Sequence, residues 1–214
     1  MIKNLINISY GITVNNETKE IKTLLDLLIL LIDAQDEIIV LQDITNENLE
    51  VTHILDSYGD KIKRMQSSLN GDFAAFKNNL ISASAKKYLF QIDADEYPKP
   101  ELIKNIKWFL LKNFRADCFL VPRINTVEGI TEEDIKNYEW KINEKNYINF
   151  PDFQNRLFKV NGKIRWENKV HEKLVNYSKL KRLPVKNENY CLVHPKGIER
   201  QRKQNAFYDT LESR

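Results

Sequence analysis

The chain has 214 residues, of which 42% are hydrophobic and 29% are charged. This composition is typical of a globular protein, and the length allows one domain with a sizeable core that needs no disulfides or metal ions for stability. Its 33 basic and 30 acidic residues give a formal net charge of +3, too small to indicate a nucleic-acid-binding protein by charge alone. Six glycines and six prolines exclude collagen-like and low-complexity chains.

The cysteines and the apolar segments narrow the class of protein further. Cys118 and Cys191 lie far apart without CxxC spacing, which argues against a disulfide framework or a zinc site. The most apolar run, residues 27–32, is far shorter than the roughly 20 residues that a membrane-spanning helix needs. The first residues lack the order of a signal peptide. We therefore expect a cytoplasmic protein with reduced thiols.

Strands and helices are predicted to alternate through the first half of the chain. Continuous apolar runs such as residues 37–41 (EIIVL) and 88–92 (YLFQI) are typical of strands buried on both faces of a parallel sheet. Strands are expected at residues 5–14, 37–41, 61–65, 88–92 and 118–121, and helices at residues 21–32, 46–58, 72–85 and 100–110. This order predicts a doubly wound α/β fold with a mostly parallel central sheet and helices on both faces.

The second half of the chain has a different character. Residues 126–149 are polar, charged and aromatic, and we interpret them as a surface excursion that forms a flap above a site. Residues 153–160 and 163–166, separated by an Asn-Gly dipeptide, predict a β-hairpin. The polar residues 197–214 predict a C-terminal helix. Because the chain has no internal repeat and no linker, we expect a single domain.

Two carboxylates, Asp93 and Asp95, directly follow the predicted strand at residues 88–92. Ligands bind open α/β sheets at the carboxyl ends of the strands, and two carboxylates there provide hard oxygen ligands for Mn²⁺ or Mg²⁺. Such a metal ion neutralises a diphosphate and stabilises its departure as a leaving group. The same spacing occurs in solvated turns, so the position after a buried strand and before a proline-opened helix is what favours a metal site.

Three further polar residues are candidates for nucleotide contacts. Asp43 follows the strand at residues 37–41, at the same edge of the sheet, where a carboxylate accepts hydrogen bonds from a base or ribose. Its alternative role is in a turn or a helix cap. Lys77 and Asn78 lie in the helix before Asp93, from which they reach a nucleotide or, alternatively, belong to the polar face of the helix.

Titratable residues also cluster in the second half. Glu172, in the stretch WENKVHE, is a candidate general base because a carboxylate near a metal site takes the proton of an attacking hydroxyl; its alternative is a surface glutamate. His194 is a candidate metal or phosphate ligand, or else a structural histidine. A positive cluster that counters phosphates, or forms a solvated helix face, consists of Lys196, Arg200, Arg202 and Lys203.

Taken in chain order, these residues resemble the family 2 glycosyltransferases, which have the GT-A fold. The stretch FKNNLISASAKKYLFQIDADEYP resembles the segment of that family that ends in Asp-Ala-Asp-Glu, and RLFKVNGKIRWENKVHEKL resembles its Arg-Leu-Phe to Val-His-Glu segment. HPKGIERQRKQNAFY resembles the tail of the subgroup that includes lipopolysaccharide-core glucosyltransferases. The resemblance covers residues 3–208.

The resemblance implies a metal-dependent, inverting glycosyltransferase that moves a sugar from a nucleoside-diphosphate sugar, UDP-linked, to an acceptor hydroxyl. The acceptor would be a glycan, a lipid-linked sugar, a protein or a modified nucleobase. The implied fold is a single Rossmann-like GT-A domain over residues 1–214, with a small C-terminal hairpin and helix region. Residues 1–124 would bind the nucleotide sugar, and residues 125–214 would form the acceptor and catalytic half.

The resemblance also implies a role for each candidate residue. Asp43 with Asn78 would hold the nucleobase, Asp93 the donor ribose or the metal, Asp95 and His194 the metal, and Lys77 and Lys196 the donor, while Glu172 would be the base. Two departures from the family pattern bear on these roles. Lys77 replaces the usual arginine and lacks its bidentate geometry. The glycine expected before Val-His-Glu is absent, and Glu167 in that loop is the alternative base.

Three competing classes of protein are less consistent with the sequence. A nucleotidyltransferase on a similar core usually has a glycine-rich basic loop after the first strand, where this chain has Thr13-Val14-Asn15-Asn16. A degenerate nucleotide-sugar-binding domain would not need the acidic residues and histidine that are present. A metal-dependent nuclease would have more carboxylates converging on the metal.

Overall fold

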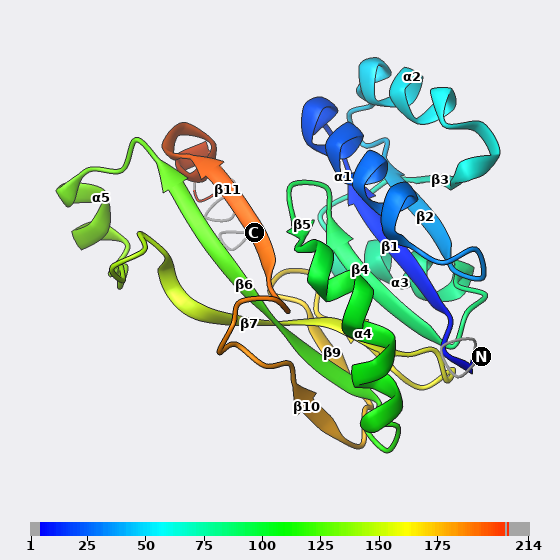
Figure 1. Cartoon of the computed structure of the whole chain (residues 1–214). Coiled ribbons are helices and arrows are strands. Elements are labelled where there is room, and N and C mark those ends of the chain that lie inside the picture. Colours follow the sequence, from blue (N-terminus) through cyan, green and yellow to red (C-terminus); the bar gives the residue numbers. More distant parts are fainter. Residues whose placement is uncertain (1–4, 204, 206–214) are drawn as a thin grey trace.

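The computed structural model of the chain describes residues 5–203 and residue 205, and its centre is one nine-stranded sheet (Figure 1). The strand order is β3-β2-β1-β4-β7-β6-β11-β5, and β10 pairs with β6. These strands are β1 (Ile8–Val14), β2 (Glu37–Asp43), β3 (Lys63–Ser67), β4 (Tyr88–Asp93), β5 (Tyr97–Pro98), β6 (Cys118–Glu128), β7 (Ile148–Lys159), β10 (Leu180–Arg182) and β11 (Leu192–Gly197). Strands β1 to β4 are parallel, whereas β7 runs antiparallel to both β4 and β6. The predicted mostly parallel α/β sheet is confirmed.

Helices cover both faces of this sheet, as the alternation of elements predicts. The helices are α1 (Thr18–Leu31), α2 (Leu49–Ser57), α3 (Phe73–Ala83), α4 (Pro100–Lys112) and α5 (Glu132–Asn137). Apolar side chains of α1, α2 and α4 belong to one buried cluster, and those of α3 belong to a second cluster. Figure 1 shows α3 behind the sheet and α1 and α4 in front of it.

The carboxyl ends of the parallel strands lie side by side at one edge of the sheet. The register pairs Thr13 of β1 with Leu41 of β2 on one side and with Asp93 of β4 on the other. Asp43 is the last residue of β2. The parallel strands therefore bring the candidate carboxylates of the first half to one edge.

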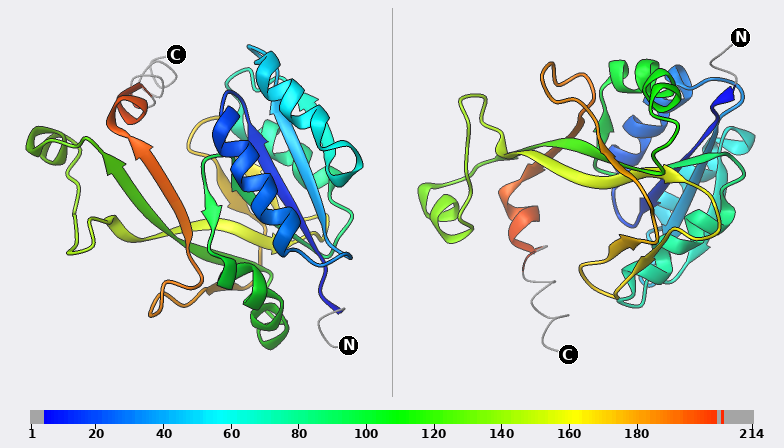
Figure 2. Two further views of the ribbon diagram at one scale, coloured as in Figure 1. Left: turned by 45° about the horizontal axis from the view of Figure 1, so that its top comes forward. Right: turned by 90° about the horizontal axis from the view of Figure 1, so that it is seen from below.

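In the second half of the chain, β6 and β11 form a long extension of the sheet, which we call the arm. Strand β6 runs across position 124, so the expected division into residues 1–124 and 125–214 falls inside a strand and stays a prediction. Figure 2 shows β6 and β11 extending together away from strands β1 to β4, with α5 near the far end of β6. The expected excursion at residues 126–149 contains the end of β6, the helix α5 and the start of β7.

The predicted hairpin between residues 153–160 and 163–166 is wrong. Strand β7 pairs with β4 and β6. The following strand, β8 (Arg165–Glu167), instead forms a separate two-stranded sheet with β9 (Lys173–Val175). The turn at Gly162 does form, with a φ of 73°, but it joins strands that belong to different sheets.

Burial explains why β7 takes these distant partners. Leu157 and Phe158 are fully buried and belong to opposite clusters of the core. A two-stranded hairpin with residues 163–166 would leave one of these side chains in water, whereas pairing inside the large sheet buries both. The Asn-Gly signal therefore predicts the turn correctly and the strand pairing incorrectly.

The remaining expectations concern the C-terminus and the membrane. Residues 198–203 and 205 are helical, in agreement with the predicted tail helix. Residues 204 and 206–214 of that prediction lie outside the described part of the chain. Within residues 5–203 and 205, no helix has the length and apolar character that crossing a bilayer requires.

Helix α3, which precedes β4 and Asp93 in the chain, packs closely on β1. A Cβ atom at Gly11 would lie 2.8 Å from Leu89 Cδ1 and 3.3 Å from Leu80 Cδ1. The lack of a side chain at Gly11 therefore allows Leu80 to approach the strand. Leu80 has no exposed surface.

We expect the Leu80→Ala variant to lose about 2–5 kcal/mol of unfolding free energy, because it leaves a cavity between α3 and β1. Leu30→Ala is the matched control, since Leu30 lies on α1 and is 80% exposed. Urea denaturation of both variants measures the difference. Equal losses in the two variants would contradict this packing.

Candidate active site

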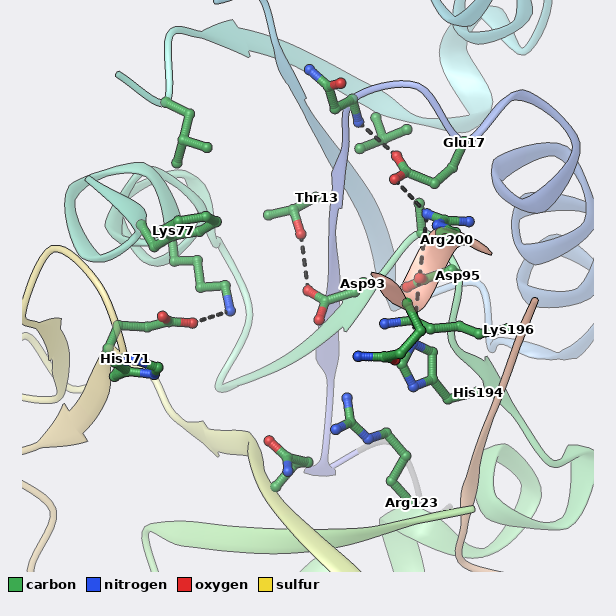
Figure 3. A pocket seen from close by; sticks show the side chains of 18 of the residues that line it. Thr13, Glu17, Lys77, Asp93, Asp95, Arg123, His171, His194, Lys196 and Arg200 are labelled. Carbon is green, nitrogen blue, oxygen red and sulfur yellow. Dashed lines mark hydrogen bonds and ion pairs between the residues drawn. The ribbon is translucent and has the colours of Figure 1, made fainter. Parts of the chain in front are cut away.

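A cavity of about 1750 Å³ lies along the carboxyl edge of the parallel strands. Its walls come from the ends of β1, β2 and β4, from α3, from β6 and β7, and from β11. Most of the predicted site residues line it, namely Asp43, Lys77, Asp93, Asp95, Glu172, His194 and Lys196. Figure 3 shows two groups of side chains facing each other across Asp93, with Lys77 and His171 on one side and Asp95, His194, Lys196 and Arg200 on the other.

Asp93 is fixed in the middle of the cavity by two partners. Thr13 Oγ1 donates to Asp93 Oδ1 at 3.1 Å, and an Arg156 guanidinium nitrogen donates to Oδ2 at 2.5 Å. Burial acts to raise the pKa of Asp93, but the positive charges of Arg156, Lys77 and Arg123 outweigh it and hold the pKa well below its usual range. Asp93 is therefore an anion with a defined orientation.

A buried ion network lies beneath Asp93. The carboxylate of Glu96 has no exposed surface, and its Oε1 accepts from Arg156 at 2.6 Å and from Arg123 at 2.8 Å. Arg123 also pairs with Asp152 Oδ2 at 2.7 Å. Burial acts to raise the pKa of Asp152, but Arg123 and two amide hydrogen bonds lower it on balance. The network connects β4, β6 and β7 through ionised side chains.

Asp95 and His194 meet on the opposite side of the cavity. His194 Nε2 lies 3.3 Å from Asp95 Oδ2, and an Arg200 guanidinium nitrogen lies at the same distance from that oxygen. Burial acts to raise the pKa of Asp95, whereas the hydrogen bond to His194 and its charge lower it on balance. Lys196 lies near this group, and burial lowers the pKa of its ammonium despite the opposing charge of Asp95.

The positive cluster that follows His194 is divided between two places. Arg200 faces the cavity and also pairs with Glu17 at 2.7 Å and Glu20 at 3.2 Å at the start of α1. Arg202 instead pairs with Asp134 of α5 at 2.9 Å. Arg200 therefore brings a positive charge to Asp95, while Arg202 fastens the tail helix to α5.

Asp43 organises the wall at the end of β2. Its Oδ1 accepts from the backbone N–H and the hydroxyl of Thr45 and from the backbone N–H of Leu69. Its Oδ2 accepts from the Asn15 side chain at 3.2 Å. The turn role and the cavity-lining role of Asp43 therefore coexist, because one carboxylate holds three segments that line the cavity.

Lys77 and Glu172 form a pair across the cavity from His194. Lys77 Nζ lies 2.5 Å from Glu172 Oε1, and both side chains are largely buried. The Lys77 ammonium also lies over the Trp166 ring, 5.1 Å from its centroid. The side chain of the alternative base, Glu167, is about half exposed and pairs with Arg165, and Glu167 is absent from the cavity wall that the described residues form.

Asn78 has a different placement from the one expected. Its side-chain amide donates to the Trp166 carbonyl at 3.0 Å and accepts from the Trp166 N–H at 2.9 Å. Asn78 does not line the cavity, so its placement does not support a direct nucleobase contact. It clamps β8 to α3 and thereby holds the chain that continues to Glu172.

The three expected metal ligands, Asp93, Asp95 and His194, do not form one group. Among residues 5–203 and 205, no set of three or more His, Cys, Asp or Glu side chains is arranged to hold a metal ion. Asp95 and His194 meet, whereas Asp93 is held by Thr13 and Arg156. The described part of the chain therefore offers two converging ligands.

Sequence reasoning missed the residues that hold these groups in place. Arg156, Arg123, Asn125 and Asp152 were not among the candidates, although Arg156 opens the RLF stretch that carries the family resemblance. Its neighbours in sequence give no sign of the ion pair, because Asp93 lies 63 positions away.

The fold and the site together define an α/β domain with carboxylates at the strand ends and a cavity beside them. Residues 9–174 match the family described as glycosyl transferase family 2. The match covers more than half of the chain, so the chain belongs to glycosyl transferase family 2. The expected family is thereby confirmed, while the likeness to the lipopolysaccharide-core subgroup stays a prediction.

Two curated relatives are similar in sequence. The SPbeta prophage-derived glycosyltransferase SunS of Bacillus subtilis (strain 168) is 28% identical over 173 residues, which is 80% of this chain and 35% of the relative. Glycosyltransferase SunS of Bacillus phage SPbeta gives the same values. The chain therefore spans about a third of the length of these relatives.

Solved structures agree on the fold. The crystal structure of S. aureus TarS matches with a TM-score of 0.62 at 16% identity, and the match covers 89% of this chain and 37% of TarS. The TarS 1–349 structure gives the same TM-score and identity and is covered to 60%. At this identity the likeness shows the fold alone, which is the expected GT-A fold.

We expect Asn78→Ala to lose about 1–3 kcal/mol of unfolding free energy, because it removes both hydrogen bonds to the Trp166 backbone. Asn79→Ala is the matched control on the same helix, since the Asn79 side chain donates to Ser67 Oγ at 3.4 Å, a longer and weaker hydrogen bond. Urea denaturation compares the two variants. A loss no greater than that of the control would show that the clamp contributes nothing.

Proposed function

We propose that this chain is the catalytic domain of a metal-dependent, inverting glycosyltransferase that uses a UDP-linked sugar. The observation that carries the proposal is the arrangement of the cavity. Asp95, His194 and two cations lie on one side, and Glu172 lies on the other. The donor diphosphate needs positive charge beside it, and the acceptor hydroxyl needs a base, and these groups must lie on opposite sides of the transferred sugar. Family membership supports the same reaction.

The residues fit a Mn²⁺ or Mg²⁺ ion that is shared with the donor. Such ions are commonly held by one or two protein ligands together with substrate phosphates and water, not by a cage made only of protein. Asp95 and His194 would be the two protein ligands. When bound, the metal would neutralise charge on the departing diphosphate. Arg200 and Lys196 add positive charge beside it.

The nucleoside would lie against the ends of β1, β2 and β4. Asp43 would contact the nucleobase. Its carboxylate accepts hydrogen bonds from Asn15 and Leu69 in the same wall of the cavity. Asp93 would accept a hydrogen bond from the donor ribose, with Arg156 keeping it ionised. The proposal of a uridine donor draws on TarS, which has been crystallised with UDP and with UDP-GlcNAc.

The acceptor would enter along the wall formed by the second half of the chain. Trp140, Ile148 and Phe153 line the cavity there. This is the end of the cavity that the excursion at residues 126–149 reaches, which supports its expected role in acceptor contacts. The acceptor classes in question are a glycan, a lipid-linked sugar, a protein and a modified nucleobase.

Glu172 would act as the general base. Its carboxylate would take the proton of the acceptor hydroxyl while that oxygen bonds to the anomeric carbon, and the bond from this carbon to the diphosphate would break on the opposite face. The ion pair with Lys77 would orient the carboxylate. Inversion at the anomeric carbon follows from attack opposite the leaving group.

The metal role is tested by Asp95→Ala, with Asp60→Ala as a control at an exposed position outside the cavity. In wild type, UDP at 100 times its dissociation constant with Mn²⁺ should stabilise the fold by about 2.7 kcal/mol in thermal unfolding. Asp95→Ala should lose the part of this shift that EDTA abolishes. An unchanged Mn²⁺-dependent shift would exclude Asp95 as a ligand, and no shift in wild type would favour a degenerate domain.

The base role is tested by Glu172→Gln, which keeps the size of the side chain and its hydrogen bond to Lys77. Release of UDP from UDP-GlcNAc should slow by about 10²–10⁴-fold, while UDP affinity stays within twofold. Glu167→Gln, outside the cavity, should release UDP at the wild-type rate. Normal turnover in Glu172→Gln would assign the base to another carboxylate.

A further inference from the structure

His194 is held through both of its ring nitrogens. Nδ1 lies 2.9 Å from Asn125 Oδ1, and Nε2 lies 3.3 Å from Asp95 Oδ2. The contact with Asn125 is built into the sheet, because the parallel pairing of β11 with β6 places His194 directly beside Asn125. His194 is 7% exposed, so water has little access to its ring.

The orientation of the Asn125 amide follows from the chemistry of Asp152. Asp152 is paired with Arg123 at 2.7 Å, and an ionised carboxylate only accepts hydrogen bonds. Asn125 Nδ2 lies 2.9 Å from Asp152 Oδ2 and must therefore be the donor there. The other end of the amide, the acceptor Oδ1, is thereby turned toward His194.

The proton on His194 is then placed by elimination. Because Asn125 Oδ1 only accepts, Nδ1 of His194 must carry the proton that joins them. In the neutral form of the ring, which is the form that binds metal, this proton on Nδ1 is the only one, and the lone pair is on Nε2. Nε2 lies 3.3 Å from Asp95 Oδ2. In the protonated ring Nε2 donates to Asp95, and in the neutral ring a divalent cation bound by both groups would replace that proton.

We propose that Asn125, with its amide oriented by Asp152, is a positioning residue that keeps the His194 proton on Nδ1 and so presents Nε2 to the divalent metal ion. The inference rests on the metal site of the proposed function. Ligating histidines generally have their second nitrogen hydrogen-bonded in this way, which sets the tautomer and the direction of the ring. The partner of His194 here is the Asn125 amide, which donates to the Asp152 carboxylate of the ion pair with Arg123.

The same ion pairs extend to the other side of the cavity. Arg123 bonds both Asp152 and Glu96, and Glu96 shares Arg156 with Asp93. One connected group therefore orients Asp93 directly and His194 through Asn125. The same buried ion-pair network thus orients both the proposed metal ligand on β11 and the proposed donor-binding carboxylate on β4.

The tautomer is measured by ¹⁵N NMR of the histidine rings without metal, above the usual titration range of histidine. The chain has three histidines, and substitution of His53 and of His171 by glutamine assigns the signals. Wild type should show the His194 proton on Nδ1, and Asn125→Ala should lose this preference.

Calorimetry of Mn²⁺ binding in the presence of UDP gives a second readout. Asn125→Ala should weaken Mn²⁺ binding by about 10–100-fold. Asn105→Ala, on the exposed face of α4, should leave both the tautomer and the affinity unchanged. Far-ultraviolet circular dichroism confirms that each variant is folded.

Three outcomes separate this inference from the proposed function. A wild-type His194 with its proton on Nε2 overturns the inference, as does an Asn125→Ala variant with unchanged tautomer and unchanged Mn²⁺ affinity. If Asn125→Ala changes the tautomer but wild type binds no Mn²⁺ with UDP, the positioning of the proton by Asn125 is supported and the metal site of the proposed function fails.

Discussion

The carboxylate of Glu96, which has no exposed surface, is the constraint on which the site depends. Two guanidinium groups, those of Arg156 and Arg123, donate to the same oxygen of this carboxylate. Removing buried charges from water is costly, and the cost is offset only where each charge keeps close partners. Loss of Glu96 would leave each of these two largely buried cations with one carboxylate partner instead of two. Glu96 therefore joins the end of β4 to β6 and β7 and tolerates little change.

This buried network explains how a mostly parallel sheet acquires an active-site cleft. Strands β1 to β4 bring Asp43 and Asp93 to one edge, which is where ligands bind open α/β sheets. Strand β7 then runs antiparallel beside β4 and brings Arg156 beneath Asp93. The long arm of β6 and β11 adds the opposite wall, with His194 at its base.

The two walls of the cleft have different physical characters. On the side of α3, Lys77 and Glu172 neutralise one another beside the Trp166 ring, and Asn78 secures the backbone of that tryptophan. On the side of β11, Asp95 lies within reach of several cations, an environment that favours anionic ligands. In our proposal, the first wall activates the acceptor and the second accepts the leaving diphosphate.

The sequence by itself determined the strand and helix alternation and the carboxylates at the ends of β2 and β4, because buried runs and helix periodicity are local patterns. The family came from the resemblance of whole motifs. Only the tertiary structure decided which side chains meet. Asn78 was expected at a nucleotide but clamps β8, and the hairpin expected at β7 gave way to pairing inside the large sheet. Arg156 contacts Asp93, 63 positions away, and Asn125 contacts His194, 69 positions away, and such long-range contacts leave no periodic trace in the chain.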